Sequence, residues 1–137
     1  MPECFDVAAV RHFRDGGILS ERQSLDNADQ LFGFAAECAI KSALVTLPGC
    51  VQQGELSNPF RHKHVKELWD LVPLLGLQRR YPGLLAVLRG LKQAFGDWST
   101  DQRYGPDDTV TAEVLDRHRE AAKRLLGSVG LTGQRGR

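Results

Sequence analysis

Residues 25–47 read LDNADQLFGFAAECAIKSALVTL, and apolar side chains recur through them at helical spacing. These side chains cover most of the helix circumference instead of one stripe. A helix that is apolar on nearly all sides is surrounded by other elements, and the many alanines here let neighbours approach closely. Ser24 or Asp26 is suited to the start of the helix, and Pro48 and Gly49 end it. The stretch therefore predicts a central helix.

The rest of the chain has the same helical periodicity and few strand signals. A mostly polar loop is expected over 50–59, and a second loop, containing Trp98 and Tyr104, over 96–106. Asp15, Gly16 and Gly17 are expected to interrupt the first helix. The fold class predicted is all-α, an up-and-down bundle of four or five helices around the central helix. Residues 1–127 form one domain in this prediction and 128–137 a flexible basic tail. The outer helices are predicted over 4–14, 62–72, 81–95 and from Asp107 or Asp108 to 127.

The composition narrows the classes of function. The chain has 137 residues and a net charge of +1, so no global field draws it to nucleic acid or a membrane. No stretch approaches about 18 consecutive apolar residues, which predicts no membrane span. The first residues have neither a basic start nor an apolar core typical of a signal peptide. The three cysteines form no C-x-x-C pair, which favours a reducing, cytoplasmic setting.

One polar line runs along the central helix, and it has two interpretations. The first is a solvated face carrying a Glu37–Lys41 pair at i,i+4. In the second, Glu37 and Lys41 line a partly enclosed cleft, and Gly33 leaves room for a ligand or a neighbouring helix. Buried charges are costly without partners, so this interpretation expects a cation such as Arg103 nearby. The members of the line are Asp26, Gln30, Gly33, Glu37 and Lys41.

Basic and aromatic residues mark two further segments. The densest basic run is 61–66, RHKHVK, in which His64 is expected to point inward, either as a capping or core histidine or as part of a site. A metal site shared with Cys50 lacks a third ligand at useful spacing, so no metal and no cofactor are expected. Arg103 and Tyr104 form a basic–aromatic pair of a kind that can hold phosphate and stack on a base.

The segment 27–41, NADQLFGFAAECAIK, resembles the signature helix of the HEPN family of small prokaryotic helical proteins. Residues 11–13, 64–69 and 98–104 are similar, in this order, to one bacterial branch of that family. The resemblance implies a helical bundle that is often a homodimer; many members are RNA-cutting toxins or partners of nucleotidyltransferases. Nuclease members carry Arg-x4–6-His. None of the four histidines of this chain has an arginine at that spacing.

The leading hypothesis is a non-catalytic HEPN-type module that binds a nucleotide, RNA or a partner protein, as part of a toxin–antitoxin or defence system. Lys41 and Arg103 would hold phosphate, Tyr104 would stack, and Glu37 would orient a cation or accept from a base or ribose, with His64 in the same cleft. The alternative is a divergent metal-independent ribonuclease that uses His64 and Arg103. A third interpretation is a purely structural dimerisation module. A nucleotidyltransferase-type partner is expected in the first case.

Overall fold

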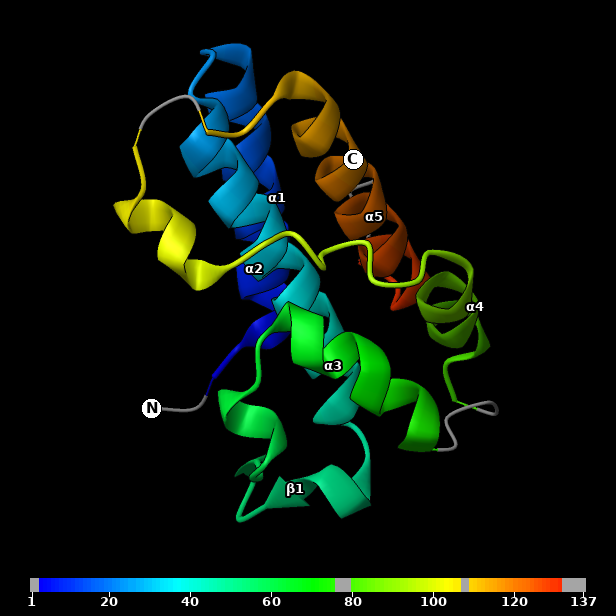
Figure 1. The fold of residues 1–137 in the computed structure, drawn as a ribbon. Helices are drawn as coiled ribbons and strands as arrows, with labels where there is room; N and C mark the ends of the chain where they lie inside the picture. The colour runs from blue at the N-terminus through cyan, green and yellow to red at the C-terminus, as the bar shows by residue number, and fades with distance from the viewer. Residues whose placement is uncertain (1–2, 76–79, 107–108, 132–137) are drawn as a thin grey trace.

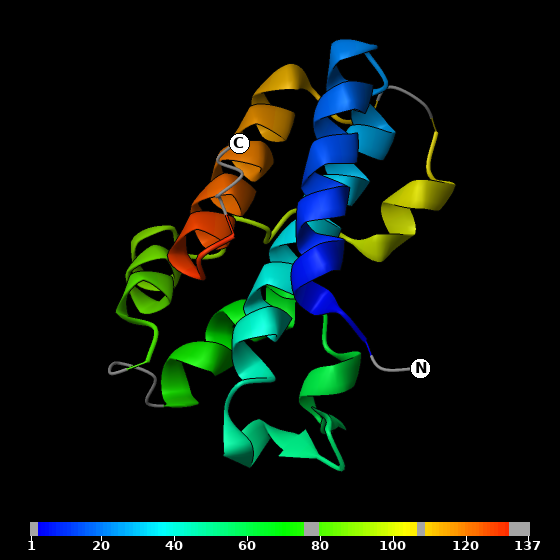
Figure 2. The same ribbon diagram turned by 180° about the vertical axis from the view of Figure 1, so that it is seen from behind.

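The computed structural model describes residues 3–75, 80–106 and 109–131. Helix α2 runs through the middle of the molecule, with α1 and α5 alongside it and the shorter α3 and α4 around its other end (Figure 1). The view from behind shows α1 covering the opposite side of α2 (Figure 2). This confirms the predicted all-α bundle around a central helix. The α-helices of the described residues are α1 (Phe5–Glu21), α2 (Leu25–Leu44), α3 (Val65–Leu71), α4 (Pro82–Gly90) and α5 (Ala112–Ser128).

Burial along α2 decides between the two interpretations of its polar line. Glu37 and Lys41 are 8% and 4% exposed, and Gln30 and Gly33 are buried as well. The solvated-face interpretation is therefore wrong, because neighbouring elements cover this side of the helix too. Within the described helices, none is both long and apolar enough to cross a membrane.

Helix α1 is longer than predicted. The expected interruption at residues 15–17 is wrong, because the helix continues to Glu21. Gly16 is buried against the ring of Phe32 on α2, and a Cβ at this position would lie 2.9 Å from Phe32 Cε1. The ring of Phe13 packs on the same Phe32 ring at 5.4 Å between centroids. The glycine thus serves close helix packing and does not end the helix.

A small hairpin occupies the predicted polar loop over 50–59. Strand β1 (Val51–Gln52) pairs antiparallel with β2 (Glu55–Leu56), and the connection is a two-residue turn. Gln53 and Gly54 both have positive φ, 53° and 79°, as a type I′ hairpin turn requires. The expectation of a loop failed because strands of two residues show no alternation, and because Gln-Gly is a weaker turn signal than Asn-Gly.

Several predicted helix ends shift. Residues 60–62 form a separate 3₁₀ turn, η2 (Phe60–His62), so α3 begins at Val65. Helix α4 ends at Gly90, five residues before the predicted end, and the remainder forms turns. Helix α5 begins at Ala112, where Thr111 Oγ1 accepts from the N–H of Val114 at 3.2 Å. The predicted start at 107–108 and most of the predicted tail, 132–137, lie outside the described residues.

The segment after α4 is fastened to α2 by Trp98. Its indole is 1% exposed, and Nε1 donates to the carbonyl of Asp29 at 2.9 Å. The indole meets the rings of Phe34 and Phe95 edge-on. The room that Gly33 leaves is filled by this indole. The 3₁₀ helix that follows, η4 (Thr100–Tyr104), consequently lies beside the first half of α2 (Figure 1).

Candidate functional site

Glu37, Lys41 and His64 form one polar cluster between α2 and α3. One carboxylate oxygen of Glu37 lies 3.1 Å from Lys41 Nζ, and the other lies 2.9 Å from His64 Nδ1. The side chains of Glu37 and Lys41 are 10% and 6% exposed, whereas that of His64 is 48% exposed. The cluster thus runs from the interior to the surface and ends on an imidazole.

Local structure explains how the three side chains meet. Positions 37 and 41 are one turn apart, so both project from the same face of α2. His64 occupies the N-cap position of α3, and its backbone N–H donates to Glu67 Oε1 at 2.8 Å. Val65 directly after it is fully buried, which fixes the start of α3 in the core. His64 therefore has little freedom to leave Glu37.

The ammonium group of Lys41 has its hydrogen-bond partners within the chain. Besides the contact with Glu37, Nζ donates to the carbonyl of Arg61 at 3.0 Å and lies 5.8 Å from the centroid of the Phe5 ring. An ammonium group has three donors, and two of them are used here. Its geometry suits fixing the carboxylate of Glu37 and the loop at Arg61.

His64 is the chemically available member of the cluster. A carboxylate on Nδ1 favours the tautomer that carries its proton there, which leaves Nε2 as an acceptor or base; once protonated, the same nitrogen donates to an anion. Nε2 makes no hydrogen bond to any residue that the structure describes. The arrangement can therefore accept a proton from a hydroxyl or donate one to a phosphate.

We call residues 61–66, from Arg61 to Lys66, the basic loop, and His64 lies within it. Arg61, His62 and Lys66 are exposed. The guanidinium of Arg61 makes an exposed ion pair with Glu55 at 3.3 Å, a contact that contributes little to stability. His64 is therefore flanked in sequence by basic residues that solvent reaches, while the charged groups in contact with it are the carboxylates of Glu37 and Glu67.

His12, one of residues 11–13 that carry part of the family resemblance, packs on the α2 side of α1. Its ring lies 6.0 Å from that of Phe34. Burial lowers the pKa of His12, and the charge of the neighbouring Arg11 lowers it further. The imidazole is held in its neutral form over a wider pH range than a free histidine.

The other two predicted site residues, Arg103 and Tyr104, belong to a different segment. Both lie in η4, and Tyr104 is 75% exposed; the side chain of Arg103 is outside the described part of the structure. The side chain of Gln102 holds this segment to α2 through Asp29. Asp29 is eight residues before Glu37, about 12 Å along a helix axis. The structure thus brings together Glu37, Lys41 and His64, and anchors the Arg103–Tyr104 segment two turns away.

Sequence reasoning missed a second polar cluster, the Asp–His–Asp network. His118 on α5 is fully buried; its Nδ1 lies 2.6 Å from Asp29 Oδ1 and its Nε2 lies 2.8 Å from Asp97 Oδ1. Only the doubly protonated ring donates to both carboxylates. The ring also stacks on Phe95 at 4.8 Å. In the sequence His118 stands at helical spacing from Leu115 and Ala122, but no local signal pairs it with Asp29, which lies 89 positions away.

The network reaches the surface at Asp97. Two guanidinium nitrogens of Arg117 hold its carboxylate, one of them at 2.6 Å. The hydrogen bond from Arg117 and then that from His118 keep the pKa of Asp97 well below its usual range. Because His118 is enclosed and its ring nitrogens are both engaged, the network acts as a structural bridge between α2, α5 and the segment after α4.

Neither a cluster of metal-binding side chains nor a similarity to known proteins assigns a further role to these residues. In the described ranges, no group of three or more His, Cys, Asp or Glu side chains is arranged to hold a metal ion. No protein-family model, no curated protein and no solved structure matches the chain.

Proposed function

We propose that the chain is a helical module of the HEPN type that binds RNA, or a nucleotide, through phosphate at the basic loop. The observation that supports this is a half-exposed imidazole, His64, which a buried carboxylate, Glu37, holds in one orientation in a segment whose neighbouring residues Arg61 and Lys66 are basic and exposed. Burying Glu37 and Lys41 costs desolvation that an apolar pair would avoid. A fixed polar group at the surface is what contact with a ligand requires.

The three residues of the polar cluster contribute to phosphate binding in different ways. His64 Nε2 donates to a phosphate oxygen when protonated, or accepts from a ribose hydroxyl when neutral. Glu37 orients His64, and Lys41 acts through Glu37 instead of touching the phosphate, because its ammonium is enclosed. The exposed Tyr104 beside Arg103 offers a stacking surface further along α2 for a longer RNA.

The test is binding of a fluorescein-labelled single-stranded RNA, followed by fluorescence anisotropy over a range of salt concentrations. Lys63→Ala/Lys66→Ala removes two charges of the basic loop, and Lys92→Ala/Lys123→Ala removes two charges elsewhere as a matched control. Each phosphate contact to a single strand adds about 0.7 to the salt slope, so losing two weakens binding about 25-fold at 0.1 M salt. Equal loss in both double variants, or no binding by the native chain, would refute the proposal.

A cap-preserving variant tests His64 itself. Asparagine is a good N-cap residue, so His64→Asn keeps the start of α3 and removes the imidazole. RNA affinity is expected to fall while the thermal midpoint changes little. If no RNA or nucleotide binds, capture of a nucleotidyltransferase-type partner or a homodimer in solution would favour the interaction-module interpretation instead.

The Glu37–His64 contact favours a second candidate, a divergent metal-independent ribonuclease with His64 as general base. Arg103, two turns away along α2, would hold a phosphate further along the same RNA strand in this candidate. A carboxylate that fixes the tautomer of a histidine is a common way to prepare a base. Incubation of total RNA with the native chain and with His64→Asn, Glu37→Gln and Arg103→Ala variants in EDTA tests this. Cleavage that His64→Asn abolishes supports it; no cleavage, or equal cleavage by all, excludes it.

A further inference from the structure

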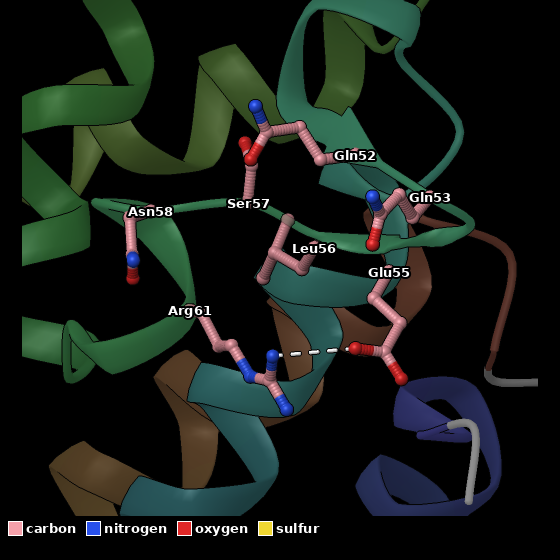
Figure 3. Close-up of a pocket in the computed structure, with 7 residues that line it drawn as sticks. All are labelled: Gln52, Gln53, Glu55, Leu56, Ser57, Asn58 and Arg61. Atoms are coloured by element: carbon pink, nitrogen blue, oxygen red, sulfur yellow. Dashed lines mark hydrogen bonds and ion pairs between the residues drawn. The ribbon is translucent and has the colours of Figure 1, made fainter.

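A polar pocket lies under the hairpin, next to the basic loop. Its volume is about 300 Å³. Figure 3 shows polar side chains arranged around Leu56, with the contact between Arg61 and Glu55 along one side. The volume is at the lower end of the range for small-molecule sites, which suits one heterocycle. The lining residues are Gln52, Gln53, Glu55, Leu56, Ser57, Asn58 and Arg61.

The walls of this pocket are held in place by the fold. Leu56 forms the floor and is 2% exposed, so it belongs to the core. The carbonyl of Cys50 accepts from both the N–H and the hydroxyl of Ser57, at 2.9 and 3.0 Å. The N–H of Arg61 donates to the carbonyl of Ser57 at 3.1 Å. A ligand would therefore meet a preformed surface, which lowers the entropy lost on binding.

Three carboxamides of the pocket remain available to a ligand. The side chains of Gln52, Gln53 and Asn58 are exposed and make no hydrogen bond to any residue in the described ranges. Each carries a donor and an acceptor side by side. The edges of nucleobases present donors and acceptors in the same adjacent pattern, and Asn and Gln read them with paired hydrogen bonds.

Arg61 joins this pocket to the proposed phosphate site. Its side chain lines the pocket, while its carbonyl accepts from Lys41 of the polar cluster. We propose that the pocket binds the base of the nucleotide whose phosphate lies at the basic loop. The inference rests on the proposed function and adds base recognition to it. The planar guanidinium of Arg61 at the rim is suited to stacking on that base.

Free nucleosides test the pocket without any phosphate. The side-chain NH₂ signals of Gln52, Gln53 and Asn58 are followed by ¹⁵N-resolved NMR while adenosine, guanosine, cytidine and uridine are titrated in turn. At least one nucleoside is expected to shift these signals to saturation and to leave that of Asn27 unchanged. Asn27 is an exposed carboxamide at the other end of the bundle. Shifts for no nucleoside, or equal shifts for Asn27, would overturn the base pocket.

Homopolymeric RNAs then separate the two proposals. The native chain is expected to prefer one base by at least about fivefold, the discrimination of one good paired contact. Gln52→Leu and Asn58→Ala should reduce that preference to near one, and the control Asn27→Ala should keep it. Binding of RNA without any base preference would refute the base pocket but not the phosphate site. Nucleosides bound without any RNA affinity refute the phosphate site and leave the pocket as a nucleoside site.

Discussion

Gly33→Ala is expected to destabilise the chain strongly, although it adds only one methyl group to α2. A Cβ at this position would lie 1.9 Å from Trp98 Cε2 and 2.3 Å from its Nε1. Carbon atoms in contact normally lie about 3.5–4.0 Å apart, so the indole must move by at least about 1.6 Å. It has no free space to move into, because it is 1% exposed and packs against Phe34 and Phe95.

The magnitude follows from three contributions. Overpacking a core costs about 1–3 kcal/mol, and displacing the indole breaks its buried hydrogen bond to the Asp29 carbonyl, worth about 1 kcal/mol. Alanine gains about 1 kcal/mol over glycine in helix propensity. If the indole leaves the core, the loss approaches the 3–5 kcal/mol that a buried tryptophan contributes. The three contributions together lower the free energy of unfolding by about 1–3 kcal/mol as long as the indole stays in the core.

Urea unfolding followed by circular dichroism at 222 nm measures this change. Gly17→Ala is the matched control, because a Cβ there meets nothing within 4 Å, and it should stabilise the chain by about 1 kcal/mol. Trp98→Leu removes the clashing ring, so Gly33→Ala should cost much less in that background, with a coupling of about 2 kcal/mol. Native stability in Gly33→Ala, or strict additivity with Trp98→Leu, would refute the reasoning.

Three further predictions concern ionisable groups. Glu37→Gln should lower the free energy of unfolding, measured by urea unfolding, by about 3–5 kcal/mol, because it leaves the buried ammonium of Lys41 without a counter-charge. Adding Lys41→Met to Glu37→Gln should recover part of that loss, and no recovery would contradict this. The pKa of Asp97 lies below its ordinary value of 3.8, so unfolding takes up a proton in acid. The free energy of unfolding should therefore fall as the pH drops below about 4. Asp97→Asn should make this pH dependence weaker when unfolding is measured over a series of acid pH values. Burial raises the pKa of the Cys38 thiol to about 12. At pH 8, iodoacetamide should therefore alkylate the exposed Cys4 of the folded chain and leave Cys38 unmodified, as measured by mass spectrometry. Equal alkylation of the two cysteines would argue against this burial.

The fold was predictable because its main signal is local. Periodicity and the proline–glycine stop defined α2 to within a few residues, and apolar side chains over most of its circumference placed it at the centre. Gly16 was misread because a glycine that ends a helix and one that admits a neighbouring ring look the same in sequence. The difference is the Phe32 ring packed against it, which comes from another helix.

The candidate site was predictable in part. Glu37 and Lys41 stood out as charges on an otherwise apolar helix. The expectation that His64 points inward was wrong for most of its ring, because Nδ1 meets buried Glu37 but the side chain is 48% exposed. That His64 touches Glu37 could not be read from sequence, because the two are 27 positions apart and the contact depends on how α3 crosses α2. No sequence pattern predicted the hairpin pocket, because its residues come from two-residue strands and a turn.

Sequence by itself determined that the chain is an all-α bundle with an apolar central helix, because helix formation and amphipathicity are properties of neighbours a few positions apart. Only the tertiary structure decided which polar residues of that helix are enclosed and by what. Asp29, in the first turns of α2, is enclosed because α5 brings His118 against it from 89 positions away. Such contacts depend on the relative placement of whole helices, which the packing of Trp98 on Gly33 and of Phe32 on Gly16 fixes.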